Sequence, residues 1–327
     1  MSDAGSMHHD SIVIDGLNVS RWGRDTFAAM KQAGVTASNA TVTVRHGFRQ
    51  TVEMLADWQR WFETESNVIA PVLKTADIHD AKKSGRAGII LGFQNATPIE
   101  DDLRLISVFK SLGVRIVQLT YNTRNHIGDG CMETPGAGLS HYGRAAVREM
   151  NRQGVLIDLS HCGYQTTMDA IERSEAPVAL THANPRALCP SPRNHLDEEF
   201  EACASKGGVI GATAFPSFLP TQRQSVEGLI DAIDYLVALV GIDHVGIGLD
   251  FIDDQPREYF FPESPSSQQF YEEGTVPEWP WTYPDGVRST KDWPNVTTAL
   301  LRRGYLPEDA RKIIGLNFLR LFDAVWR

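Results

Sequence analysis

Eight short apolar runs alternate with segments of helical periodicity along this chain, and the alternation predicts a (β/α)8 TIM-like barrel, an α/β fold. The apolar runs, which we interpret as β-strands, cover residues 12–14, 35–44, 89–92, 114–119, 155–159, 178–181, 209–212 and 245–248. Strands that alternate with helices build βαβ units and a parallel sheet. No internal repeat or low-complexity linker interrupts them, so we expect a single barrel domain over residues 1–327.

Between the strands, apolar residues recur at the spacing of one helix face. The segments with this spacing cover residues 25–32, 52–64, 103–112, 142–152, 166–173 and 226–240. A last segment, residues 318–325, is amphipathic, and we expect it to pack on the outside of the barrel.

Residues 253–292 have neither period and are rich in proline and aromatic residues. This segment follows the eighth strand, where the active-site loops of a barrel lie. A long loop inside a compact domain usually serves as a lid, a binding loop or a subunit contact. Because buried aromatic residues suit a substrate cover and a homodimer contact equally well, both roles stay open.

The composition excludes a nucleic-acid surface, because a net charge of −10 leaves no basic stripe of the kind such surfaces need. The four cysteines lack Cys-x-x-Cys spacing, which argues against a zinc ribbon or redox pair and fits reduced thiols in the cytoplasm. Residues 1–10 are small and polar, without the apolar stretch of a secretory signal, and no segment could span a membrane. We therefore expect a cytoplasmic protein with no membrane partner, and a mobile N-terminal tail around His8 and His9.

Ionisable residues follow three of the predicted strands directly. His161 and His182 follow two consecutive strands, and Asp250 follows the eighth. Because the reactive groups of a barrel gather at the C-terminal ends of its strands, we expect these side chains in one mouth. Two neutral imidazoles are good ligands for Zn²⁺, and a carboxylate can bind a metal or take a proton from water. A lone histidine is usually a satisfied structural residue, but this constellation favours a metal or catalytic role.

Polar residues in the loops beyond the strands are candidates for binding a small-molecule substrate. Arg193 follows the sixth strand, and its planar guanidinium can fork onto a carboxylate. Tyr121 and Asn122 follow the fourth strand and can bind polar substrate groups. A turn after the first strand is a sufficient explanation of Asp15, and we assign no role to His195, which lies in the same loop as Arg193.

At these residues the sequence resembles the membrane (renal) dipeptidase family of metal-dependent amidohydrolases. The resemblance extends over nearly the whole chain and is most specific in residues 138–161, 177–194 and 245–251. It implies a TIM-like barrel that hydrolyses small dipeptides at a two-zinc site. It also implies one zinc on His161 and His182, a role for Asp250 toward the other metal and in catalysis, and a substrate carboxylate on Arg193.

The sequence departs from the family pattern in the first half of the metal site. Leu17 and Val19 occupy the positions of a His-x-Asp pair, and Gln94 occupies that of the metal-bridging glutamate. Tyr121 replaces a substrate-binding histidine. Without a bridging carboxylate two like-charged ions are not held together. We therefore expect at most one zinc ion, bound weakly by two histidines or absent. Gln94 is then free to donate to an oxyanion or bind a substrate carbonyl.

The leading functional hypothesis is a dipeptidase-like hydrolase that cuts an amide bond in a small, carboxylate-bearing substrate. Asp250 acts as the base, His161 and His182 bind one metal, and Arg193 binds the carboxylate. Two alternatives stay open. One is a non-catalytic barrel that binds a small molecule, and the other is a metal-free enzyme in which Asp250 and a histidine form an acid–base pair.

Overall fold

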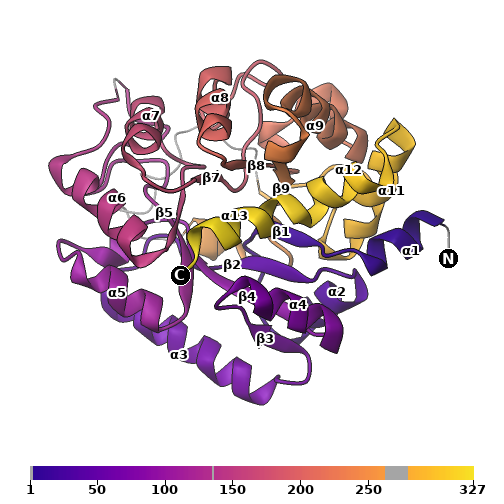
Figure 1. Cartoon of the computed structure of the whole chain (residues 1–327), viewed down its shortest axis with the longest axis horizontal. Coiled ribbons are helices and arrows are strands. Elements are labelled where there is room, and N and C mark those ends of the chain that lie inside the picture. Colours follow the sequence, from indigo (N-terminus) through magenta and orange to yellow (C-terminus); the bar gives the residue numbers. More distant parts are fainter. Residues whose placement is uncertain (1–2, 135, 262–278) are drawn as a thin grey trace.

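A ring of eight parallel strands surrounded by helices forms the computed structural model, which describes residues 3–134, 136–261 and 279–327 (Figure 1). Neighbouring strands of the ring pair along the order β1-β2-β4-β5-β6-β7-β8-β9. Their bounds are β1 (Ile14–Asn18), β2 (Ala37–Thr43), β4 (Ala87–Phe93), β5 (Val114–Gln118), β6 (Leu156–Asp158), β7 (Ala179–Leu180), β8 (Val209–Ala212) and β9 (Val245–Ile247). The predicted barrel is confirmed, and a short strand that was not predicted, β3 (Ile69–Pro71), pairs with β4 outside the ring.

The ring closes between β1 and the segment that follows β9. The backbone N–H of Asp250 donates to the carbonyl of Leu17 (3.0 Å), and that of Val19 donates to the carbonyl of Phe251 (2.7 Å). The carboxylate of Asp15 accepts the N–H of Leu249 at 3.0 Å. The assignment of Asp15 to a turn was therefore wrong. Strand β1 continues to Asn18, and the buried Asp15 side chain joins the first strand to the last.

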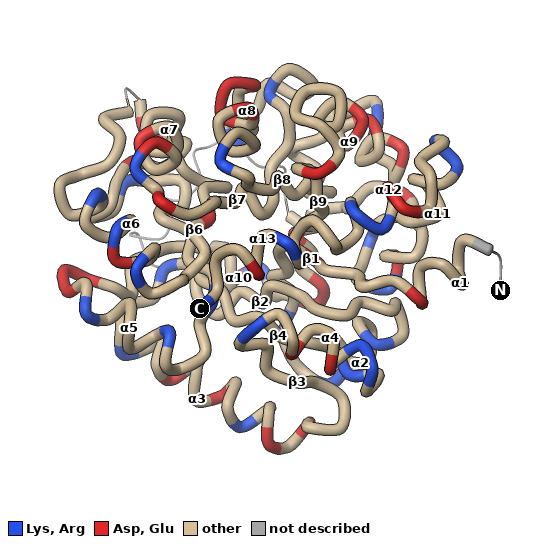
Figure 2. Tube along the Cα trace, viewed as in Figure 1, with Lys and Arg blue, Asp and Glu red and all other residues tan. Residues whose placement is uncertain are grey.

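Helices surround the ring on its outer side, and charged residues lie mainly on them (Figures 1 and 2). The helices predicted from periodicity are α2 (Arg24–Gln32), α3 (Phe48–Thr64), α5 (Arg104–Ser111), α6 (His141–Gln153), α7 (Tyr164–Arg173), α9 (Val226–Val240) and α13 (Asn317–Val325). Those not predicted include α4 (Thr75–Ser84), α8 (Asp197–Ser205), α10 (Arg257–Phe260) and α11 (Trp293–Arg303), whereas the acidic start of α12 (Pro307–Arg311) is typical of a helix N-terminus. Helices α4 and α8 each bury only two or three side chains, so their apolar period is weak. Among the described residues, no helix is both long and apolar enough to cross a membrane.

Helix α13 closes the N-terminal end of the barrel, contrary to its predicted place on the outside (Figure 1). Its Phe318 and Phe322 join a buried layer to which seven strands each contribute one residue, namely Ile14, Ala37, Ile90, Ile116, Leu156, Ala179 and Val209. Gly16 and Gly246 leave room for the Phe318 ring, which a Cβ atom would approach within 2.8 Å and 2.6 Å. This layer fills the N-terminal end of the ring, and the reactive groups of a barrel lie at the opposite rim.

The N-terminal residues form a helix, α1 (Asp3–Asp10), and the prediction of a mobile tail was wrong. His8 is fully buried, with Nε2 2.7 Å from the carbonyl of Ala33 and Nδ1 2.6 Å from the hydroxyl of Thr297. The carbonyl can only accept, so Nε2 carries the proton and Nδ1 accepts from the hydroxyl. Burial lowers the pKa of His8 to about 4, and the imidazole is neutral in the folded protein.

The depressed pKa of His8 predicts a loss of stability in weak acid. The unfolded chain binds a proton as the pH falls below 6.5 and the folded chain does not until about pH 4, so stability decreases between these values. At pH 5 the loss due to His8 is about 2 kcal/mol. Urea unfolding of the native chain and of His8→Gln at pH 7.5 and pH 5 should show this extra loss in the native chain only. His9→Gln, at an exposed neighbour, should behave as the native chain does, and equal pH dependence of all three would contradict the assignment.

Candidate active site

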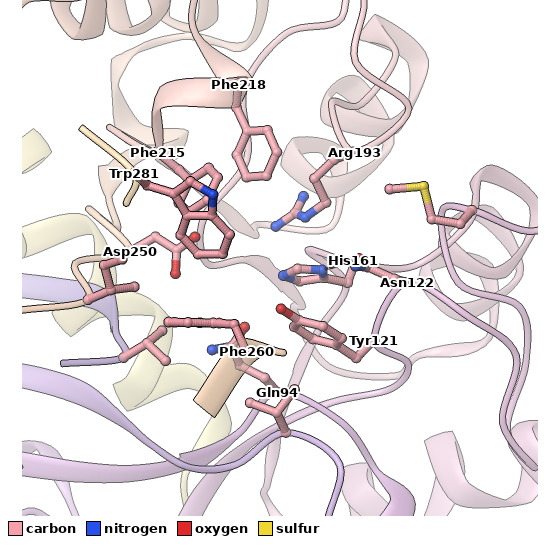
Figure 3. A pocket seen from close by; sticks show the side chains of 14 residues that line it. Gln94, Tyr121, Asn122, His161, Arg193, Phe215, Phe218, Asp250, Phe260 and Trp281 are labelled. Atoms are coloured by element: carbon pink, nitrogen blue, oxygen red, sulfur yellow. Dashed lines mark hydrogen bonds between the residues drawn. The ribbon is translucent and has the colours of Figure 1, made fainter. Parts of the chain in front are cut away.

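A cavity lies at the C-terminal ends of the strands, and residues from the loops after most of the strands line it (Figure 3). Its lining residues are Val19, Val44, Gln94, Tyr121, Asn122, Met132, His161, Arg193, Phe215, Phe218, Asp250, Ile252, Phe260 and Trp281. Arg193, His161 and Tyr121 direct their polar ends from one side toward Asp250 on the other. His182 does not line the cavity but lies directly behind His161.

The two histidines contact each other, with Nε2 of His161 3.0 Å from Nε2 of His182. The amide oxygen of Asn122 lies 2.7 Å from Nδ1 of His161 and can only accept, so this nitrogen carries the proton. The hydroxyl of Thr181 donates to Asp158 at 2.7 Å and therefore accepts from Nδ1 of His182 at 2.8 Å. Both Nε2 atoms are left with lone pairs that face each other.

Two lone pairs that face each other are stabilised by a shared cation or by a proton on one ring. Hydrogen-bond partners on the outer ring nitrogens, here Asn122 and Thr181, are the kind that orient metal-binding histidines. Burial, and then the charge of Arg193, lowers the pKa of each of the two histidines well below 6.5, so both rings are neutral. Among the described residues no group of three or more histidine, cysteine or acidic side chains converges in a way that could hold a metal ion.

The Arg193 side chain is buried, and only part of the hydrogen-bonding capacity of its guanidinium is used within the described part of the chain. Its Nη2 donates to the carbonyl of His182 at 2.8 Å, while Nε and Nη1 have no hydrogen-bond partner within the described part of the chain. The guanidinium carbon lies 5.2 Å from the centre of the Phe218 ring, a cation–π contact. Burial lowers the pKa of Arg193, against the charges of nearby groups that include Asp250. An anion in the cavity would satisfy the two remaining nitrogens.

Asp250 faces Arg193 across the cavity from a strained backbone (Figure 3). Its φ is +58°, as is that of Asn122, and aspartate and asparagine are the side chains that best tolerate this left-handed region. Tyr283 donates its hydroxyl to the Asp250 carbonyl and helps to hold this conformation. Burial raises the pKa of Asp250 to about 8, although the Arg193 charge opposes the rise.

The remaining predicted residues are buried at the rim. Leu17 packs into the hydrophobic core, while Val19 reaches the cavity. Nε2 of Gln94 donates to the hydroxyl of Thr41 at 2.9 Å. The Tyr121 ring stacks on His161, with ring centres 4.2 Å apart.

His195, to which no role was assigned from the sequence, is buried behind the histidine pair. Its Nε2 lies 3.0 Å from the carbonyl of Ser160, and Nδ1 lies 2.7 Å from the carboxylate of Glu199. Burial favours the neutral form of Glu199, but its interactions with His195, Leu196 and Thr167 together outweigh burial and lower the pKa of Glu199. His195 thus fixes the backbone that precedes His161. The four-residue spacing to Glu199 was a signal that could have revealed the pair.

The segment after β9 contributes to the cavity wall. Phe260 and Trp281 both line the cavity, and this supports a role in covering the substrate. Residues 262–278 of the predicted loop lie outside the described residues, and the dimer contact stays a prediction.

Comparisons with known proteins identify the family and the fold of the chain. The family model for membrane dipeptidase (peptidase family M19) matches residues 17–259. Dipeptidase tcpJ of Claviceps purpurea (strain 20.1) is 29% identical over 285 residues, which are 85% of this chain and 60% of that protein. Dipeptidase aclJ of Aspergillus oryzae (strain ATCC 42149 / RIB 40) is 28% identical, over 85% of this chain and 61% of its own length. The match therefore spans about three fifths of these curated relatives.

Two solved structures from Pseudomonas aeruginosa share the fold. An amidohydrolase superposes with a TM-score of 0.94 at 40% identity, over 99% of both chains. The probable dipeptidase PvdM superposes with a TM-score of 0.83 at 22% identity, over 99% of this chain and 97% of its own, and this likeness shows the fold alone. The family match extends over more than half of the chain and shows that this chain belongs to the membrane dipeptidase family, peptidase family M19.

Proposed function

We propose that this chain hydrolyses an amide bond in a small substrate that bears a carboxylate. The observation that carries the proposal is Arg193, whose buried guanidinium has two nitrogens without a hydrogen-bond partner among the described residues, in a cavity shared with Asp250 and His161. Buried guanidinium nitrogens that lack hydrogen-bond partners are unfavourable. A substrate carboxylate that accepts from both nitrogens removes this cost, and the planar fork fixes its orientation.

The residues around this anchor can carry out the reaction. Asp250 lies across the cavity, and its ionised form, which predominates above about pH 8, acts as general base on a water molecule. The water oxygen bonds to the carbonyl carbon, the carbon–nitrogen bond breaks, and Asp250 returns the proton to the leaving nitrogen. The Gln94 amide has one N–H left after its bond to Thr41, and it can donate to the oxyanion.

The donor set does not fit a two-zinc site. By the family resemblance, Leu17, Val19 and Gln94 stand at ligand positions and supply two apolar side chains and a neutral amide. The donor set fits one ion, which the Nε2 atoms of His161 and His182 would hold. A bound divalent ion would polarise the substrate carbonyl or its attacking water.

Purified protein should carry at most one tightly bound divalent ion per chain, because two nitrogens are the only oriented ligands among the described residues. Elemental analysis of protein prepared without added metal measures this. The double variant His161→Gln and His182→Gln should lose the ion, while His126→Gln, at an exposed histidine, should keep it. The triple variant Leu17→His, Val19→Asp and Gln94→Glu should gain zinc. Two ions per native chain that survive dialysis would contradict the one-ion site.

Asp250→Asn should lower kcat/KM on a panel of small carboxylate-bearing amides by roughly a thousandfold, within the range for loss of a general base. Asparagine tolerates the same left-handed backbone, so the melting temperature should change little. Asp254→Asn is a matched control, because Asp254 has a φ of 57° but is exposed. Full activity of Asp250→Asn would remove the residue from the mechanism. Binding without turnover by the native chain would favour the non-catalytic barrel.

Arg193→Lys should raise KM by about tenfold or more, because lysine keeps the charge but cannot form two parallel hydrogen bonds to a carboxylate. Steady-state kinetics on an amide and on its carboxamide analogue separate the effects. The native chain should prefer the acid, and the variant should lose most of that preference. An unchanged preference would show that Arg193 does not bind the carboxylate.

A further inference from the structure

The part of the cavity that the proposed mechanism does not use is apolar. Eight of the described lining residues carry apolar side chains, namely Val19, Val44, Met132, Phe215, Phe218, Ile252, Phe260 and Trp281. They come from loops on different sides of the ring, so the apolar surface surrounds the space between Arg193 and Asp250 (Figure 3).

Aromatic rings form a rigid wall on this surface. Phe215 packs edge-to-face on Trp281, with centres 4.9 Å apart and planes at 72°, and contacts Phe218 at 4.7 Å. Trp281 also packs on Phe260, 4.8 Å away. Such contacts hold each ring in place, so the wall is formed before a ligand arrives. Because Phe218 also lies under the guanidinium of Arg193, the wall begins where the carboxylate binds.

Val19 extends the apolar surface to the rim of β1. Its backbone is fixed by the hydrogen bond to Phe251, and its side chain lines the cavity. An ammonium group placed against valine loses its water without gaining a partner, which is strongly unfavourable. A neutral alkyl or aromatic group in the same place gains from burial.

The charges of the cavity also bear on the ligand. Within the described lining the charged side chains are Arg193 and Asp250, and the mechanism uses both. Among the described lining residues the α-ammonium of a free dipeptide finds a negative charge only at Asp250, and pairing there engages the proposed base. Elsewhere it meets the neutral polar groups of Gln94, Tyr121 and Asn122 or apolar side chains such as Val19. A substrate whose acyl group bears no amino group avoids both outcomes.

We propose that the preferred substrate is an N-acylated amino acid with an apolar, aromatic acyl group, taken in preference to a dipeptide with a free amino terminus. This inference rests on the proposed function, because it assumes a carboxylate on Arg193. Hydrolysis adds the water oxygen to the acyl carbon, breaks the carbon–nitrogen bond and leaves the proton on nitrogen. The products are an aromatic carboxylic acid and a free amino acid.

Binding of three compounds to the native protein, measured by titration calorimetry, tests the inference. 3-Phenylpropanoyl-glycine and phenylalanyl-glycine differ only in the α-ammonium group, and acetyl-glycine lacks the ring. We expect 3-phenylpropanoyl-glycine to bind at least tenfold more tightly than either of the others. Equal affinity for the first two compounds, or tighter binding of phenylalanyl-glycine, would overturn the inference.

Variants assign the preference to residues. Phe215→Leu should lower the affinity for 3-phenylpropanoyl-glycine by fivefold or more and leave the affinity for acetyl-glycine nearly unchanged. Val19→Asp should shift the preference toward phenylalanyl-glycine. Leu306→Ala, a truncation at a residue that is 57% exposed, should have no effect. Melting curves identify a variant that does not fold. In that case the inference is decided by the native protein alone, from the ratio of its affinities for 3-phenylpropanoyl-glycine and phenylalanyl-glycine.

Turnover of the same compounds separates this inference from the proposed function. If the binding preference holds and nothing is hydrolysed, the proposed hydrolysis fails and the ligand class stands. If phenylalanyl-glycine is hydrolysed and 3-phenylpropanoyl-glycine is neither bound nor cleaved, the hydrolase stands and the preference for acylated substrates is wrong.

Discussion

Four hydrogen bonds to the buried carboxylate of Asp158 determine the geometry of the histidine pair. Asp158 accepts from the backbone N–H and hydroxyl of Ser160, and from the N–H and hydroxyl of Thr181. A carboxylate at the end of β6 is tolerable in the interior only when such donors surround it. Because the Thr181 hydroxyl is committed to Asp158, it must accept from His182, and this sets the tautomer of that ring. One buried acid thereby orients a histidine that it does not contact.

A second buried acid has the same role on the opposite side of the ring. Asp15 accepts from Leu249 and from the indole of Trp293, and so holds the segment that carries Asp250 against β1. Burial raises the pKa of Asp15 to about 7, and the two carboxyl groups are near enough for the charge on Asp15 to raise the pKa of Asp250 further. The closure of the barrel and the chemistry of its rim therefore depend on the same contacts.

The sequence predicted what depends on local periodicity and little of what depends on long-range contacts. The eight strands of the ring are apolar runs, and His161 and Asp250 were placed at the rim because strand ends are recognisable. The roles of Asp158 and Asp15 were not visible, since each acid is embedded in an apolar run and its donors come from other segments. His8 looked like part of a polar tail because its partners, Ala33 and Thr297, lie far along the chain. The aromatic wall joins Phe215 to Trp281 across two loops that no spacing rule connects.

On the proposed function, the scarcity of metal ligands and the apolar character of the cavity are physically linked. By the family resemblance Val19 stands at the position of a carboxylate, and in this structure it contributes apolar surface to the cavity. A carboxylate there could neutralise either a second metal ion or a substrate ammonium, and valine can do neither. Among the polar residues of the lining, Arg193 and His161 face Asp250 across the same space. A ligand must therefore offer an anion to the two nitrogens of Arg193 that have no partner among the described residues, and it must place neutral groups on the apolar surface. A ligand without the anion leaves those buried nitrogens without acceptors. A ligand without the neutral groups leaves the apolar wall in contact with water.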